Sequence, residues 1–306
     1  MKISLITACF NSEATIRTAI ESVLSQKGVE LEYIVVDGGS KDGTVDIIKE
    51  YSTRSTRLND VNSSLHVSTC STWLTFKWIS ERDRGMYDAI NKGIKMATGD
   101  VVGILNADDV LASDDTLAHI AELFSRKERK DRKDDSRVEH VERVEGEGVG
   151  SRVEHVERVD CVYADIRFVK EGESVEAVRK AETVRYCSAK RWRPWMFRFA
   201  AMVPHPSFYV RRECFVRLGG YSLDYRICAD FELELRYLYL AKLRAAYLPE
   251  CVVVMRMGGM STAGWRSNIV INREDLRALR SHGIWSCLPL IYLKYLFKIW
   301  GFVFRR

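Results

Sequence analysis

The sequence predicts an α/β fold with a mixed, mostly parallel sheet flanked by helices. Two short apolar runs of the kind found in buried strands, Ile3–Thr7 and Tyr33–Val36, are each followed by a segment with helical periodicity. Parallel strands need a long crossover connection, so this alternation favours a parallel sheet. The chain has 306 residues, of which 46% are hydrophobic, and is long enough to bury a full core.

The remaining elements continue the alternation. The first helix is expected to be capped by Ser12, and the second to begin at Thr44 after a glycine-rich turn. The later predicted elements are strands over Thr72–Ser80, Val101–Leu105, Cys161–Val169 and Ala246–Met255, and helices over Met86–Ala97, from Ser113 to Phe124, over Ala229–Leu240 and near Asn272–Ser281. They predict one large domain over residues 1–281 and a short helical appendage over 282–306.

Two stretches interrupt the alternation and are expected to be surface insertions. Residues 52–71 are rich in Ser, Thr and Asn, and residues 125–159 are dominated by charged side chains. Within the second stretch, SRVEHVERV at 136–144 recurs unchanged at 151–159, which indicates a tandem duplication. Such a composition cannot bury a core, so the duplication is expected in a solvated loop.

The formal net charge of +5 is concentrated at the C-terminus. Four of the positive charges belong to Lys294, Lys298, Arg305 and Arg306, and no acidic residue follows Ser281. The rest of the chain is nearly neutral, which argues against a nucleic-acid-binding surface.

The cysteine pattern and the first residues predict a cytoplasmic protein. The eight cysteines are scattered, with no CxxC pair and no Cys/His cluster at zinc-ligand spacing. Reduced thiols in a cytosol fit this pattern best. The apolar run Ile3–Phe10 is short, lacks a convincing cleavage site and leads into a predicted helix cap, so no secretion signal is expected.

A glycine-rich loop, DGGSKDGT at 37–44, follows the second predicted strand. Glycines permit a backbone turn there that other residues would not, and ligands bind at such strand ends in parallel sheets. The loop is neither the GxGxxG dinucleotide fingerprint nor a Walker A motif, which argues against simple dehydrogenases and P-loop proteins. Asp37 is therefore a candidate binding residue, with ordinary turn chemistry as the alternative.

Adjacent carboxylates, Asp108 and Asp109, end an NADD motif that follows another apolar strand. Two such charges repel each other unless a cation lies between them. Hard oxygen ligands of this kind suit Mg²⁺ or Mn²⁺, with phosphate oxygens completing the coordination shell. The alternative is that Asp109 only takes part in a helix-capping turn before Ser113.

Two further segments gather polar groups at predicted helix starts. ERDRGMYDAINKG at 81–93 places charged residues where a helix N-terminus would stabilise an anion. CADFELELR at 228–236 places Asp230 at a helix start and Glu234 one turn later.

Taken together, these motifs resemble those of the family 2 glycosyltransferases. The landmarks are TACFN at 7–11, DGGSKDGT, ERDRGMYDAINKG, NADD, HPSF at 205–208, GGY at 219–221, ADFELELR at 229–236 and GGMS at 258–261. The resemblance covers about residues 1–125 and 160–280, and bacterial surface-polysaccharide enzymes of the colanic-acid type look most similar. It implies the GT-A fold, a Rossmann-like mixed sheet flanked by helices.

The resemblance also implies roles for single residues. It implies that Asp37 contacts the nucleotide base and that Thr7, Ala8 and Asn11 line the same pocket. It also places Asp83 and Asn91 beside the nucleotide. Asp109, with Asp108 next to it, corresponds to the last position of a DxD-like motif that holds a divalent cation against the diphosphate. Asn106 replaces the first acid of that motif.

Asp230 corresponds to the acidic base of the family. This base removes the proton of the acceptor hydroxyl as its oxygen attacks the anomeric carbon from the face opposite the diphosphate, and inversion follows. Some relatives have an adjacent Glu-Asp pair where this chain has Ala229-Asp230, so Glu232 is the alternative base. His205 is either a buried, hydrogen-bonded histidine or a group near the diphosphate.

The resulting hypothesis is an inverting, metal-assisted hexosyl- or N-acetylhexosaminyltransferase in cell-surface polysaccharide biosynthesis. Its expected partners are a nucleotide-sugar donor, chiefly a UDP-sugar, and a glycan or lipid-linked acceptor, with Mg²⁺ or Mn²⁺ as cofactor. One alternative is an inactive nucleotide-binding partner subunit of a polysaccharide-assembly complex. A second, a nucleotidyltransferase, would ordinarily show a Gly-rich, Arg- or Lys-bearing loop after the first strand, which residues 7–11 lack.

The C-terminal segment predicts a basic amphipathic helix. Lys294, Lys298 and Arg305 fall on a common stripe of Ile284–Phe304, opposite apolar and aromatic residues. The lysines interrupt every apolar run below the ~18–20 residues that a bilayer span needs, so a membrane-spanning helix is not expected. The helix is expected either to lie on the anionic inner face of the plasma membrane or to pack against the domain or a second subunit.

Overall fold

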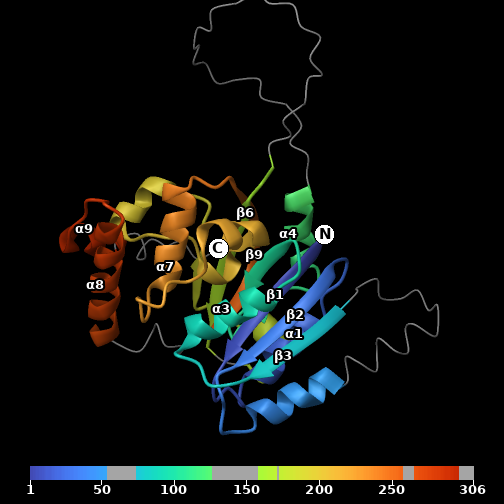
Figure 1. Ribbon diagram of the computed structural model, residues 1–306. Helices are drawn as coiled ribbons and strands as arrows, with labels where there is room; N and C mark the ends of the chain where they lie inside the picture. The colour runs from blue at the N-terminus through green and yellow to red at the C-terminus, as the bar shows by residue number, and fades with distance from the viewer. Residues whose placement is uncertain (54–73, 126–157, 171, 258–264, 296–306) are drawn as a thin grey trace, which may run out of the picture.

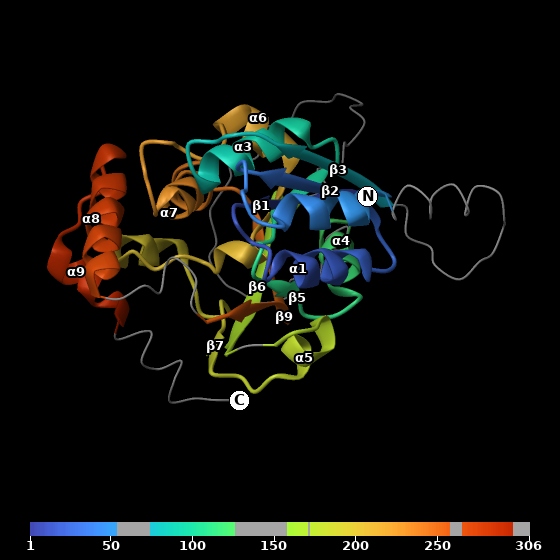
Figure 2. The same cartoon turned by 90° about the horizontal axis from the view of Figure 1, so that it is seen from below.

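The computed structural model describes residues 1–53, 74–125, 158–170, 172–257 and 265–295. A mixed sheet lies at its centre, with helices on both faces (Figure 1, Figure 2). The strands are β1 (Lys2–Cys9), β2 (Glu30–Asp37), β3 (Leu74–Ser80), β4 (Val101–Ile104), β5 (Val110–Leu111), β6 (Cys161–Val169), β7 (Arg185–Cys187), β8 (Tyr209–Arg211) and β9 (Ala245–Arg256). The helices are α1 (Ile16–Leu24), α3 (Met86–Met96), α4 (Thr116–Ser125), α5 (Val175–Lys180), η1 (Pro194–Phe199), η2 (His205–Ser207), α6 (Arg212–Leu218), α7 (Ala229–Glu234), η3 (Leu235–Leu240), α8 (Trp265–Ser281) and α9 (Leu288–Tyr292), and residues 44–53 are also helical.

The first four strands are parallel. β1 pairs with β2 on one side and β4 on the other, and β2 pairs with β3. β6 and β9 are also parallel, whereas the short strands β5, β7 and β8 run antiparallel to their neighbours. The order along the sheet is β3-β2-β1-β4-β8-β6-β9-β5, with β7 beside β6. The predicted mixed, mostly parallel sheet is confirmed.

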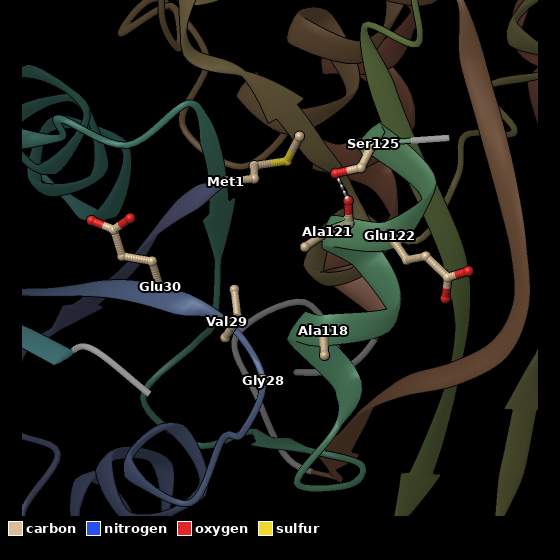
Figure 3. A pocket seen from close by; sticks show the side chains of 8 residues that line it. All are labelled: Met1, Gly28, Val29, Glu30, Ala118, Ala121, Glu122 and Ser125. Atoms are coloured by element: carbon tan, nitrogen blue, oxygen red, sulfur yellow. Dashed lines mark hydrogen bonds between the residues drawn. The ribbon is translucent and has the colours of Figure 1, made fainter. Parts of the chain in front are cut away.

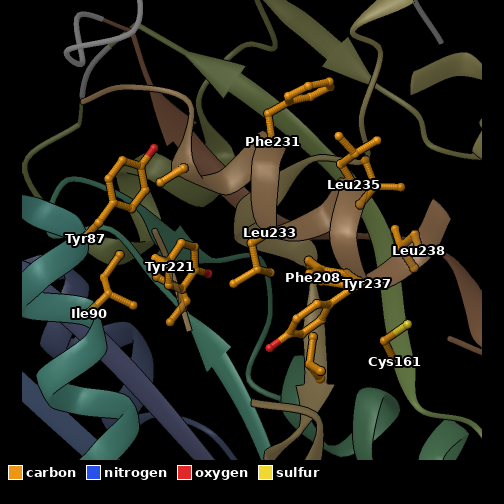
Figure 4. Packing of buried hydrophobic residues seen from close by; sticks show 14 of the residues in the cluster. Tyr87, Ile90, Cys161, Phe208, Tyr221, Phe231, Leu233, Leu235, Tyr237 and Leu238 are labelled. Carbon is orange, nitrogen blue, oxygen red and sulfur yellow. The ribbon is translucent and has the colours of Figure 1, made fainter. Parts of the chain in front are cut away.

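The apolar core has one layer on each face of the sheet, because side chains alternate between the faces along a strand. On β1, Ile6 contributes to the layer that contains α3 and α7, whereas Leu5 contributes to the layer that contains α1 and α4. Figure 4 shows the first layer, in which Tyr87 of α3 lies near Tyr221 and Leu233 of α7 is also buried. This packing brings α3 and α7 together, although more than a hundred residues separate them in the sequence.

Two details of the predicted helices are wrong. Ser12 does not cap α1 with its side chain, because a turn intervenes in which its carbonyl oxygen accepts the N–H groups of Thr15 and Ile16. The single helix expected over 229–240 is α7 followed by the π-helical turn η3, where the Ala241 N–H donates to the Arg236 carbonyl. Over one turn, hydrophobic periodicity does not distinguish this wider repeat from an α-helix.

The C-terminal helix also differs from its prediction. It begins at Leu288, and α9 contacts both η1 and α8. Lys294, expected on an exposed stripe, is buried, and its Nζ donates to Asp275 of α8 at 2.7 Å. Periodicity along one helix could not show a partner on another helix. Lys298, Arg305 and most of both predicted insertions lie outside the described residues.

The described helices include none that is both long enough and apolar enough to cross a membrane.

Candidate active site

The predicted site motifs follow the carboxyl ends of four neighbouring parallel strands. Cys9, Asp37 and Ser80 are aligned at the ends of β1, β2 and β3, and the NADD motif follows β4 on the other side of β1. Loops that leave parallel strands at their carboxyl ends share one edge of the sheet, where ligands bind in open α/β sheets. The fold therefore brings the loops after residues 9, 37, 80 and 104 to one edge.

Asp37 is fully buried and organises the glycine-rich loop. Its Oδ2 accepts hydrogen bonds from the backbone N–H of Gly39 and of Ser40, both at 3.0 Å, and from the Ser80 hydroxyl at 2.7 Å. The Ser40 hydroxyl also donates to its Oδ1. Burial raises the pKa of Asp37, but these hydrogen bonds outweigh burial, so the pKa lies below its usual value and the carboxylate is charged. Gly39 has a φ of +83°, which favours glycine at this turn.

Asn11 joins the loops after β1 and β2. Its side-chain oxygen accepts the Lys41 N–H at 2.9 Å, and its own N–H donates to the Ser40 hydroxyl at 2.7 Å. Thr7 is buried in β1, where its Oγ1 accepts a hydrogen bond from the Tyr33 hydroxyl at 3.1 Å. Ala8 packs against the opposite layer, the one that contains α3 and α7. Asn11 therefore lies at the surface of the loop after β1, whereas Thr7 lies in the core.

Asp83 and Asn91 have different surroundings. A Cβ atom on Gly38 would lie 2.5 Å from Asp83 Oδ2, so this glycine allows Asp83 to approach the glycine-rich loop closely. Asn91 lies on α3, where its side-chain oxygen accepts the Tyr221 N–H at 2.9 Å and its Nδ2 donates to the Tyr221 carbonyl at 2.8 Å. Asp83 is therefore beside the predicted nucleotide loop, whereas the Asn91 amide is engaged in holding the backbone at Tyr221.

The Asp109 carboxylate is 0% exposed. Its Oδ2 accepts a hydrogen bond from Asn106 Nδ2 at 2.8 Å, and its Oδ1 has no hydrogen-bond partner among the described residues. Burial, followed by the charge of Asp108, raises the pKa of Asp109 well above its usual value, and burial also raises the pKa of Asp108. A buried carboxylate with one unpartnered oxygen and a second acid beside it is a suitable environment for a hard cation.

Arg256, which sequence reasoning missed, lies beside this pair of acids at the end of β9. One guanidinium nitrogen donates to the Asp108 carbonyl at 2.6 Å, and another donates to Thr18 Oγ1 at 2.8 Å and to the Gly172 carbonyl at 3.0 Å. Its charge lowers the pKa of both Asp108 and Asp109, against the larger effect of burial. Its place directly after an apolar strand and just before GGMS was the only signal in the sequence.

No group of three or more His, Cys, Asp or Glu side chains that would hold a metal ion occurs in the parts of the chain that the structure describes. A cation at Asp109 would therefore depend on oxygens from outside this set, such as those of a bound diphosphate.

Asp230 is held at the start of α7. Its Oδ1 accepts hydrogen bonds from the Phe231 N–H at 2.8 Å and from the Tyr87 hydroxyl at 3.2 Å, and the same hydroxyl donates to the Ile227 carbonyl. Burial raises the pKa of Asp230 to about 6. Because Tyr87 follows Asp83 closely in the sequence, one segment contacts both the glycine-rich loop and Asp230. A carboxylate with a pKa near neutrality is suited to general-base chemistry.

Glu232, the alternative base, is engaged in ion pairs. Its carboxylate accepts hydrogen bonds from Arg236 at 2.8 and 2.9 Å and from His282 Nε2 at 2.9 Å. Burial raises its pKa, but the Arg236 and His282 contacts outweigh burial and the pKa lies below its usual value. Glu234 is fully buried and accepts the Val203 N–H at 3.1 Å. Of the three acids, Asp230 has the environment that best fits a base.

His205 is a buried, hydrogen-bonded histidine, as one of the two interpretations of the sequence expected. Its Nε2 lies 2.6 Å from the Tyr221 hydroxyl, and burial lowers its pKa to about 4, which keeps the ring neutral at pH 7. The Tyr221 ring stacks on Tyr87 at 5.5 Å between centroids. His205 thus belongs to the cluster of rings that supports the Tyr87 contact with Asp230.

Glu274 of α8 holds the backbone that precedes α7. Its carboxylate accepts the N–H groups of Arg226 at 3.2 Å, Ile227 at 2.9 Å and Cys228 at 3.0 Å. These residues immediately precede Asp230, so Glu274 fixes the position of the α7 N-terminus. The sequence carried no signal for this contact because the partners are nearly fifty residues apart.

A shallow hollow of about 470 Å³ lies near the amino ends of β1 and β2, away from the strand ends that carry the predicted site motifs (Figure 3). It is lined by the start of β2 and by one side of α4, including Val29, Glu30, Ala118 and Glu122. None of the predicted site residues lines it.

Comparison with known proteins shows which family this sequence resembles. The family model "Glycosyl transferase family 2" matches residues 4–132. A PGL/p-HBAD biosynthesis glycosyltransferase of Mycobacterium bovis is 26% identical over 276 residues, which are 90% of this chain and 83% of the relative. An uncharacterized glycosyltransferase of Mycobacterium tuberculosis is 27% identical over 235 residues, which are 76% of this chain and 68% of the relative.

Solved structures show the same fold. S. aureus TarS 1–349 in complex with UDP-GlcNAc has a TM-score of 0.56 at 16% identity, over 91% of this chain and 66% of that one. A mannosyltransferase from Pyrobaculum calidifontis in complex with GDP-Man and Mn²⁺ has a TM-score of 0.55 at 18% identity, over 98% and 72%. The alignment to a longer TarS chain spans 40% of its length. The chain described here is therefore a glycosyltransferase with the GT-A fold, and its residues 4–132 match family 2 of these enzymes.

Proposed function

We propose that the protein is an inverting hexosyl- or N-acetylhexosaminyltransferase that moves a sugar from a nucleotide diphosphate donor, a UDP-sugar, to a glycan or lipid-linked acceptor in cell-surface polysaccharide biosynthesis. The observation that carries this proposal is the Asp230 carboxylate, whose pKa is raised to about 6 at the start of α7. It is linked through Tyr87 to the segment that places Asp83 against the glycine-rich loop. A base and a donor loop are thus connected by one short stretch of chain.

Asp230 has the chemistry of the base in this reaction. As the acceptor oxygen forms its bond to the anomeric carbon, the bond from that carbon to the phosphate oxygen breaks on the opposite face. The hydroxyl proton passes to Asp230, and the electron pair of the broken bond leaves with the diphosphate. A carboxylate with a pKa near 6 is mostly charged at pH 7 and still accepts a proton readily.

We assign Asp109 as the ligand of a divalent cation, Mg²⁺ or Mn²⁺, with Asp108 beside it. The buried, unpartnered Oδ1 of Asp109 and the adjacent second carboxylate fit such an ion. When bound, the cation would offset the negative charge that develops on the leaving diphosphate. The complex of the Pyrobaculum calidifontis mannosyltransferase with GDP-Man and Mn²⁺ supports a divalent cation as cofactor.

The other predicted residues are assigned to the donor. Asp37, Ala8 and Asn11 are proposed at the base pocket together with the Thr7 backbone, and Asp83 beside the nucleotide. The UDP-GlcNAc complex of TarS supports a UDP-sugar as donor. Asn91 and His205 both contact Tyr221, and we propose that they support the nucleotide pocket by holding Tyr221 in place.

A cytoplasmic location at the inner face of the plasma membrane fits an acceptor carried on lipid. We propose that the C-terminal segment makes this peripheral membrane contact.

Thermal unfolding of the purified protein with UDP or GDP, each with and without Mn²⁺, tests the donor and metal assignments. A ligand that binds only the folded state raises the unfolding temperature. UDP with Mn²⁺ is expected to stabilise the protein, and Asp109→Asn is expected to lose that stabilisation. The control is Glu176→Gln, because Glu176 is an exposed residue of α5 that lies outside the predicted motifs.

The same experiment has an internal check on folding. A carboxyl whose pKa is raised by folding is protonated more readily in the folded state, so its charge destabilises that state at neutral pH. Asp109→Asn is therefore expected to be at least as stable as wild type without ligand. An absence of any nucleotide response in wild type would contradict the donor assignment, whereas a nucleotide response without measurable sugar transfer would favour an inactive nucleotide-binding partner subunit.

A further inference from the structure

Large apolar side chains are exposed where η1 meets α9. Trp195 of η1 is 55% exposed and Trp285, just before α9, is 74% exposed. Leu288, Tyr292 and Leu293 are exposed beside them. We call these five residues the η1–α9 surface.

The two segments of this surface are joined. The Ser286 hydroxyl donates to the Arg198 carbonyl at 2.8 Å, and α9 contacts η1. Figures 1 and 2 both place α9 at one side of the molecule, beside α8. The segments that carry the two exposed tryptophans are therefore adjacent in the fold, although ninety residues separate Trp195 from Trp285 in the sequence.

The exposed charges in the two sequence segments that contain this surface have one sign. Within residues 188–200 and 268–295, every exposed charged side chain is basic: Lys190, Arg191, Arg193, Arg198, Arg273, Arg277 and Arg280. The two acids of α8 are turned inward, since Glu274 accepts hydrogen bonds from the loop before α7 and Asp275 pairs with the buried Lys294. The surface is thus aromatic, and its flanking segments expose only positive charge.

We propose that the η1–α9 surface docks on an anionic lipid bilayer, with Trp195 and Trp285 at the level of the headgroups. Tryptophan and tyrosine are enriched at membrane interfaces because one end of each ring is apolar and the other is polar. Basic side chains near the surface add attraction to anionic lipid. This proposal deepens the membrane contact proposed above: the contact is a composite of two segments, and it includes residues far from the C-terminus.

Flotation of the purified full-length chain with vesicles tests the proposal. Binding is expected to vesicles of phosphatidylcholine mixed with phosphatidylglycerol and not to phosphatidylcholine alone, and it should weaken as salt is added. The double variant Trp195→Ala/Trp285→Ala should weaken binding at least roughly ten-fold, because two exposed rings lose their apolar burial. Arg191→Ala and Arg198→Ala should each weaken it about five-fold.

Control variants for the apolar and the basic substitutions come from α6, which is not part of the η1–α9 surface. Val216, 78% exposed, and the exposed Arg217 lie side by side in the sequence on α6, so Val216→Ala and Arg217→Ala remove an apolar and a basic group without touching the surface. Both should bind vesicles like wild type. The unfolding temperature of each variant shows that it has folded.

Three results would overturn the proposal. They are a wild-type chain that does not float with anionic vesicles, surface variants that float as well as wild type, and equal binding to neutral and anionic vesicles. The main alternative is that a second copy of the chain covers this surface. Sedimentation without lipid tests it, because a wild-type dimer that is lost in Trp195→Ala/Trp285→Ala would assign the surface to that second copy. Vesicle binding requires neither donor nor transfer, so this test stands or falls separately from the enzymatic proposal.

Discussion

At the scale of single residues, Asp230 and Glu232 lie on the same short helix and have opposite pKa shifts. Burial raises the pKa of Asp230 to about 6, whereas Arg236 and His282 hold the pKa of Glu232 below its usual value against the effect of burial. Asp230→Asn removes the proton acceptor, so we expect transfer to fall by ~10²-fold or more while the nucleotide-induced rise in unfolding temperature persists. Steady-state rates and thermal unfolding measure the two effects, with the exposed Asp224→Asn as control.

The same carboxylate predicts a pH dependence. A base must be deprotonated to act, so kcat/KM of the wild-type enzyme should rise with pH through about 6 and level off above it. If kcat/KM instead rose with pH near 4, and did so in Asp230→Asn as well as in wild type, the base would be another acid.

At the scale of elements, α8 positions α7 through one side chain. Glu274 accepts three backbone N–H groups from the residues just before Asp230. Glu274→Gln keeps the size but loses the charge, and should cost about 1.5–3 kcal/mol in the free energy of unfolding. Because Asp230 would be less firmly held, kcat should fall roughly ten-fold with little change in donor binding. Glu176→Gln, an exposed position on α5, is the control, and an unchanged kcat in a destabilised Glu274→Gln would leave Glu274 with a structural role only.

The elements also show what the sequence could predict. Buried strands such as β1, β2 and β6 contain short runs rich in apolar residues, which are local features, so their presence was predicted correctly, although β2 begins three residues before the predicted Tyr33. The pairing of Lys294 with Asp275, and of Asn91 with the Tyr221 backbone, joins residues that are distant in the sequence. Periodicity gives no information about such pairs. The motifs located the candidate site at the strand ends, but its supporting contacts came only from the tertiary packing.

At the scale of the whole molecule, the duplicated segment between α4 and β6 provides a simple test of independence. Removing residues 136–150 leaves one intact copy of SRVEHVERV, at 151–159, joined to the same preceding chain. A segment of this composition adds no core, so the unfolding temperature and the transfer rate should both be unchanged. Loss of transfer without unfolding would show instead that the removed residues 136–150 serve the reaction.

Arg256 has a further consequence for the order in which the ligands bind. Its guanidinium places a positive charge beside Asp108 and Asp109, so under the proposed metal assignment a divalent cation arriving alone would meet repulsion as well as attraction. A diphosphate arriving alone would bring excess negative charge to the same place. Each ligand should therefore favour the other, and by thermodynamic reciprocity the metal should raise the affinity for the nucleotide by the same factor as the nucleotide raises the affinity for the metal. The site would then take up its two ligands as a cooperative pair.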